Sequence, residues 1–106
     1  RLFSGCRSGS IAVLDTATGK QLQALPISKG VDDLIYDPLK KRIYAACDGT
    51  VDVYEQVDPD HYTLLGKIPT GPIAKTALLV PQMGRLFVAV PQHGETNAAV
   101  LVFTVQ

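Results

Sequence analysis

A six-residue pattern occurs three times in this chain at nearly constant spacing. The copies are RLFSGC at residues 1–6, RIYAAC at 42–47 and RLFVAV at 85–90, so their arginines stand 41 and 43 residues apart. The segments GSIAVLD (9–15) and GTVDVYE (49–55) follow in the same register. A repeat of about 40–45 residues limits the chain to helical repeats or to the blades of a β-propeller.

The local pattern within each repeat favours strands. The apolar segments are short, rich in Val, Ile, Leu, Tyr and Phe, and interrupted by Gly, Pro, Asp and Ser roughly every eight to twelve residues. Seven prolines would interrupt helices, and no segment sustains an apolar period of about 3.6 residues. The sequence therefore predicts an all-β fold of ten strands, arranged as four-stranded antiparallel β-propeller blades with essentially no helix.

About two and a half repeats are present. We expect one propeller segment over residues 1–106, divided into a partial blade (1–28), a complete blade (29–69) and a second partial blade (70–106). The strands expected in the complete blade are residues 31–36, 43–47, 50–54 and 62–68, from inner to outer. The first blade then lacks its inner strand and the last its outer strand. This count predicts the C-terminal portion of a larger ring, for example one of seven blades.

The residues that join the strands carry a family resemblance. SIAVLDTATGK (10–20) has an apolar strand ending in Asp and then a turn rich in Asp, Thr and Gly. It resembles the YVTN-type β-propeller repeats, and the similarity extends over nearly the whole chain. One departure is that Cys6, Cys47 and Val90 stand where the family has Asn. WD-type and quinone-binding repeats need Trp, which this chain lacks, so no cofactor is expected. The resemblance also favours export, to the periplasm or outside the cell.

The two cysteines occupy equivalent positions in neighbouring blades. A disulfide needs Cα atoms within about 7 Å, whereas packed sheets lie about 10 Å apart. We therefore expect Cys6 and Cys47 to be reduced and apart. No Cys or His spacing suggests a metal site. The segment from Asp58 to His61 (Asp-Pro-Asp-His) is predicted to form a turn, with calcium binding by Asp58 and Asp60 as the alternative.

Candidate binding residues come from the loops that open on one face of a propeller. These are the loops after each second strand and before each inner strand. The candidates, expected around a channel mouth, are Arg7, Lys29, Asp32, Asp48, Lys75, His93 and Glu95. The last two lie in the longest loop, where function often concentrates. Asp32 and Lys75 are expected to point toward the channel. Solvated rim residues are the alternative interpretation, and no residue is predicted to be catalytic.

Two functions are compatible with this sequence. One is a binding or scaffold module without chemistry of its own in this segment. The alternative is part of a propeller enzyme, lactonase-like or another hydrolase, with its site at the channel mouth, because fold alone does not decide function. The formal net charge is zero, so neither nucleic acid nor a membrane is the expected partner. The expected partners are the remaining blades of a parent ring, other copies of the chain, and a protein or small polar ligand.

The incomplete terminal blades predict exposed apolar flanks. We expect the first blade to expose Phe3, Ile11 and Val13, and the last blade to expose Phe87, Val100 and Val102. A closed propeller covers such faces, so the chain is not expected to persist as a compact monomer.

Overall fold

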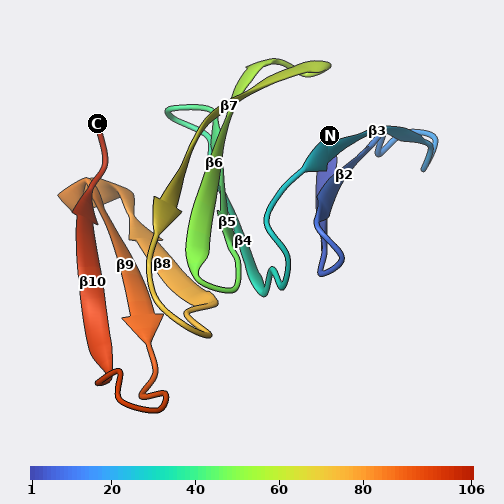
Figure 1. Ribbon diagram of the computed structural model, residues 1–106. Coiled ribbons are helices and arrows are strands. Elements are labelled where there is room, and N and C mark those ends of the chain that lie inside the picture. Colours follow the sequence, from blue (N-terminus) through green and yellow to red (C-terminus); the bar gives the residue numbers. More distant parts are fainter.

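The computed structural model describes residues 1–106 and contains ten strands in three separate antiparallel sheets. The only helical segment is a three-residue 3-10 turn, η1 (Pro81–Met83), and no helix has the length and apolarity to cross a membrane. Figure 1 shows the three sheets standing side by side, with the chain passing from one to the next. The predicted all-β fold of ten strands in blade-like sheets is confirmed.

The middle sheet has four strands in sequence order. They are β4 (Asp33–Asp37), β5 (Arg42–Ala46), β6 (Thr50–Asp58) and β7 (His61–Pro69). The last two are longer than the sequence pattern predicts. Pairing continues beyond the apolar segment until Asp58 lies opposite His61, so the predicted turn there becomes the tip of a long hairpin.

The other two sheets have three strands each. The first sheet contains β1 (Leu2–Cys6), β2 (Ser10–Leu14) and β3 (Gln21–Pro26). The last sheet contains β8 (Thr76–Val80), β9 (Arg85–Val90) and β10 (Ala99–Thr104). In the repeat register β1 corresponds to β5 and β10 to β6. The first sheet therefore has no counterpart of β4, and the last sheet has no counterpart of β7.

Two apolar clusters hold the sheets together, and both use equivalent positions. The first sheet packs on the middle sheet through Ile11, Val13 and Phe3. The middle sheet packs on the last through the residues at the same repeat positions, which are Val51, Val53 and Tyr44. Since side chains alternate between the two faces of a strand, each sheet presents one face to the sheet before it and the opposite face to the sheet after it.

The prediction of which residues the first sheet exposes is wrong. Ile11 and Val13 are fully buried and Phe3 is partly buried, all against the middle sheet. A shift of one residue along a strand moves a side chain to the other face, and it is Leu2 that is exposed on the free side. The expectation for the last sheet is confirmed at Val100 and Val102, which are exposed, whereas Phe87 is partly buried.

Candidate functional site

The loops at one end of the three sheets carry all the predicted rim residues. Arg7 lies in the β1–β2 loop, Asp48 in the β5–β6 loop, and His93 and Glu95 in the β9–β10 loop. The remaining three, which are Lys29, Asp32 and Lys75, lie in the linkers before β4 and β8. In Figure 1 this end is the lower one. All seven side chains are exposed except that of Lys75, which is partly buried.

Two of these residues form an ion pair between the first and middle sheets. Nη2 of Arg7 lies 2.6 Å from Oδ1 of Asp32. The backbone strengthens the same junction, because the N–H of Gly30 donates to the carbonyl of Arg7 at 2.8 Å. Both charged side chains are solvent-accessible, so the pair adds at most about 1 kcal/mol to stability. Its structural effect is to hold the linker against the β1–β2 loop.

Asp48, which follows Cys47 as Arg7 follows Cys6, makes the corresponding contact between the middle and last sheets. Its Oδ1 accepts a hydrogen bond at 2.9 Å from the N–H of Ile73, which stands four residues after Pro69, as Gly30 stands four residues after Pro26. Gly30 has φ 79° and Ile73 has φ 59°. The linker thus turns through a left-handed conformation in both repeats, and at Ile73 a β-branched residue adopts it, which is a strained choice.

Asp48 and Lys75 both lie close to Gly30. A Cβ added to Gly30 would lie 3.0 Å from Cβ of Asp48 and 3.6 Å from Cε of Lys75. The close approach explains why glycine stands here. An acidic and a basic side chain therefore both lie beside Gly30 at this junction, but unlike Arg7 and Asp32 they form no ion pair.

His93 and Glu95 do not join these groups. Both lie in the β9–β10 loop, where every residue from 91 to 98 is exposed. That loop closes on itself through two backbone hydrogen bonds of 2.9 Å between His93 and Thr96. Neither side chain makes a hydrogen bond or an ion pair with the other predicted residues.

The sequence analysis did not predict one buried carboxylate. Asp52 of β6 is fully buried and accepts hydrogen bonds from the N–H of Ser28 at 2.6 Å and from Oγ1 of Thr50 at 2.8 Å. Nζ of Lys67 lies 3.7 Å away. The first repeat has Ala12 at this position, so a charged residue inside an otherwise apolar strand was the signal that could have revealed it. Asp52 ties the linker after β3 to the middle sheet.

The same carboxylate affects the nearby thiol. Cys47 is fully buried, and burial together with the negative charge of Asp52 raises the pKa of the Cys47 thiol to about 11. Cys6 is partly buried, and both cysteines are free. The structure agrees with the prediction that the two thiols are apart, because it joins them by no disulfide.

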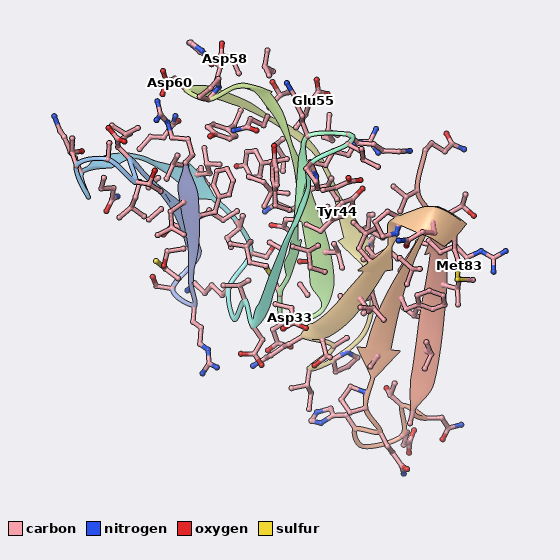
Figure 2. The ribbon with its side chains drawn as sticks, turned by 180° about the vertical axis from the view of Figure 1, so that it is seen from behind. Asp33, Tyr44, Glu55, Asp58, Asp60 and Met83 are labelled. Atoms are coloured by element: carbon pink, nitrogen blue, oxygen red, sulfur yellow. The ribbon has the colours of Figure 1, made fainter.

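A second charged cluster lies at the opposite end, on the β6–β7 hairpin, where Figure 2 labels Asp58 and Asp60. Nδ1 of His61 lies 2.8 Å from each carboxylate oxygen of Asp58. Their hydrogen bond raises the pKa of His61 and lowers that of Asp58. Asp60 pairs with Nη2 of Arg1 at 2.8 Å. Asp58 and Asp60, the alternative calcium ligands of the sequence analysis, thus pair with His61 and Arg1 of the same chain.

A cavity of about 320 Å³ lies between the middle and last sheets. Its walls include Tyr44, Val53, Leu86 and Phe103. Tyr44 is buried, and its hydroxyl has no hydrogen-bond partner. The sequence predicted no site at this place, because Tyr44 looked like an ordinary aromatic residue of the repeat.

Together these features offer a mixed-charge rim at one end and an apolar cavity between two sheets. No group of three or more His, Cys, Asp or Glu side chains converges as a metal site. No protein-family model, curated protein or solved structure matches this chain.

Proposed function

We propose that this chain supplies blades of a larger YVTN-type β-propeller and acts as a binding and scaffold module. The observation that carries the proposal is the repeated packing of the sheets. Each sheet covers the apolar face of the sheet before it, and the last sheet leaves the corresponding face open.

The exposed face of the last sheet has buried counterparts in the middle sheet. Val51 is 0% exposed and Val53 is 7% exposed, whereas their counterparts Val100 and Val102 are 65% and 53% exposed. Leu78 of β8 adds a further exposed apolar side chain. Contiguous exposed apolar surface of this kind marks an interaction site.

The free face of the first sheet corresponds to the other side of the same interface. Leu2 is 55% exposed, and its counterpart Ile43 is fully buried against the first sheet. Cys6 is partly buried where Cys47 is fully buried. The two free faces thus repeat the two sides of an interface that the chain already forms internally. They support head-to-tail packing, either with further blades of a parent ring or with other copies of the chain.

A ring built in this way gathers the loops at one end into a channel mouth. The ion pair of Arg7 with Asp32 and the neighbouring Asp48 and Lys75 would form part of that rim. Alternating acidic and basic groups suit a small polar ligand or a loop of a protein partner, because complementary charges favour specificity. Binding at this rim is the function that the geometry supports best.

Sedimentation velocity of the 106-residue chain tests the proposal. We expect concentration-dependent association. Val102→Asp should lower the association constant at least about tenfold, because a charge in the packed face must be desolvated. Leu39→Asp is the matched control. Leu39 is 83% exposed but lies in the β4–β5 turn, so association should be unchanged. A wild-type chain that stays a single folded monomer at about 50 µM would contradict the proposal.

A further inference from the structure

Two short turns project from the end of the molecule opposite the predicted rim. Residues 38–41 join β4 to β5, and residues 81–84 join β8 to β9. Both lie at the upper end of Figure 1. They are equivalent in the repeat, because Arg42 follows the first turn as Arg85 follows the second. Each turn also reverses through a left-handed residue, which is Lys41 in the first and Gly84 in the second.

The backbone connects the two turns. Nζ of Lys40 donates to the carbonyl of Val105 at 3.3 Å, and the N–H of Val105 donates to the carbonyl of Gly84 at 2.8 Å. Figure 2 labels Met83 at the tip of the second turn. The side chains of the two turns therefore belong to one surface.

Each tip carries a large apolar side chain that is exposed. Leu39 is 83% exposed and Met83 is 54% exposed. A single exposed apolar side chain is ordinary, but here two stand on neighbouring tips. Both belong to turns at the ends of the sheets, so packing of another sheet on either face would leave them uncovered. Their exposure is thus a property of this end of the molecule.

The same turns carry positive charge that no carboxylate neutralises. Arg1, Arg7 and Lys67 form ion pairs elsewhere in the chain. The four basic residues of the turns, which form no ion pair, are Lys40, Lys41, Arg42 and Arg85. The exposed acid closest in register is Glu55, opposite Arg42, and it does not pair with that arginine. A formal net charge of zero thus conceals a basic surface with two apolar tips.

We propose that these two turns bind an anionic lipid surface. Leu39 and Met83 enter the interfacial layer of the lipid, and the four basic side chains contact its acidic head groups. Each basic residue near such a surface strengthens binding about fivefold. Convex apolar tips fit a deformable layer, whereas a rigid protein partner would need a separate groove for each tip. The surface lies opposite the rim, so this proposal does not rest on ligand binding there.

Sedimentation with lipid vesicles tests the proposal. The Val102→Asp chain is used so that head-to-tail association does not interfere. We expect binding to phosphatidylcholine vesicles that contain about 30% phosphatidylserine to be at least about tenfold tighter than to phosphatidylcholine alone. Raising the salt to about 0.5 M should release the chain, because ions screen exposed charges. No binding to the anionic vesicles, or equal binding to both kinds, would overturn the proposal.

A matched pair of double variants locates the contact. Lys40→Glu with Lys41→Glu should weaken binding to the anionic vesicles at least about tenfold. Lys20→Glu with Lys29→Glu makes the same change of net charge at two other exposed lysines that form no ion pair. This control should weaken binding less than about threefold. Equal losses would show that total charge, and not these turns, governs the adsorption.

A tryptophan at the first tip tests insertion into the lipid. The chain has no Trp, so Leu39→Trp gives a single reporter. Its emission should shift to shorter wavelength with the anionic vesicles. Leu64→Trp, at a 43% exposed position of β7, should show no shift. An unchanged emission of Leu39→Trp would overturn the proposal. An equal shift with soluble polyglutamate would do the same, because it would indicate an acidic protein partner.

Discussion

Replacing Asp52 by alanine tests how far one buried carboxylate holds the linker to the middle sheet. The substitution removes the acceptor for the N–H of Ser28 at 2.6 Å, for Oγ of Ser28 at 3.2 Å and for Oγ1 of Thr50 at 2.8 Å. Alanine itself fits the strand, because Ala12 occupies the same position in the first repeat. The experiment therefore measures lost hydrogen bonds and not a change of strand geometry.

The expected loss follows from two opposing terms. Hydrogen bonds to a charged group contribute about 1.5–3 kcal/mol each, whereas burying a carboxylate costs several kcal/mol, which alanine does not incur. We expect Asp52→Ala to lower the free energy of unfolding by about 3 kcal/mol. Ser28→Ala, which removes only the longest of the three bonds, should cost about 1 kcal/mol.

Urea denaturation followed by circular dichroism measures both changes. The chains should carry Val102→Asp and be compared at one protein concentration, because association alters apparent stability. A loss below about 1 kcal/mol for Asp52→Ala would refute the reasoning. It would mean that the desolvation cost of the carboxylate offsets its hydrogen bonds, so that Asp52 contributes little to the junction.

Two further predictions concern titrating groups. In the native Val102→Asp chain, a thiol reagent at pH 8 should label Cys6 much faster than Cys47, whose pKa of about 11 leaves on the order of one thiolate in a thousand; equal rates would contradict the burial of Cys47. In an NMR titration the pKa of His61 should lie above about 6.5 and return there in Asp58→Asn. Because the folded pKa is raised, the stability gained from protonated His61 is fully present below about pH 6.5. It is lost as the pH rises through the folded pKa.

The repeat made the strands predictable, since spacing, turns and apolar pattern all agreed. It did not determine which face of the first sheet is covered. Residues such as Leu2 and Phe3 are both apolar, and alternation places them on opposite faces without indicating which face packs on the next sheet. That choice depends on how whole sheets stack.

The sequence alone does not identify the residue that turns the second linker. Gly30 and Gly71 each follow a Leu-Pro or Ile-Pro pair, yet the left-handed counterpart of Gly30 is Ile73. Gly71 is needed for another reason, because a Cβ there would lie 2.8 Å from Cγ1 of Val90. For the rim, the sequence placed seven residues at one end, but their pairing depends on side-chain geometry that the repeat register does not contain.

Mixed disulfide cross-linking tests the central claim, that the two free faces are complementary, most directly. In a Cys6→Ser background, one chain carries Leu2→Cys and another Val102→Cys. The counterparts of these positions in the internal interface, Ile43 and Val13, lie in one buried cluster. We predict that the mixture forms a cross-linked dimer of the two different chains under mild oxidation, and that neither chain cross-links alone. Dimers of either chain with itself at the same yield, or no cross-link in the mixture, would contradict the account.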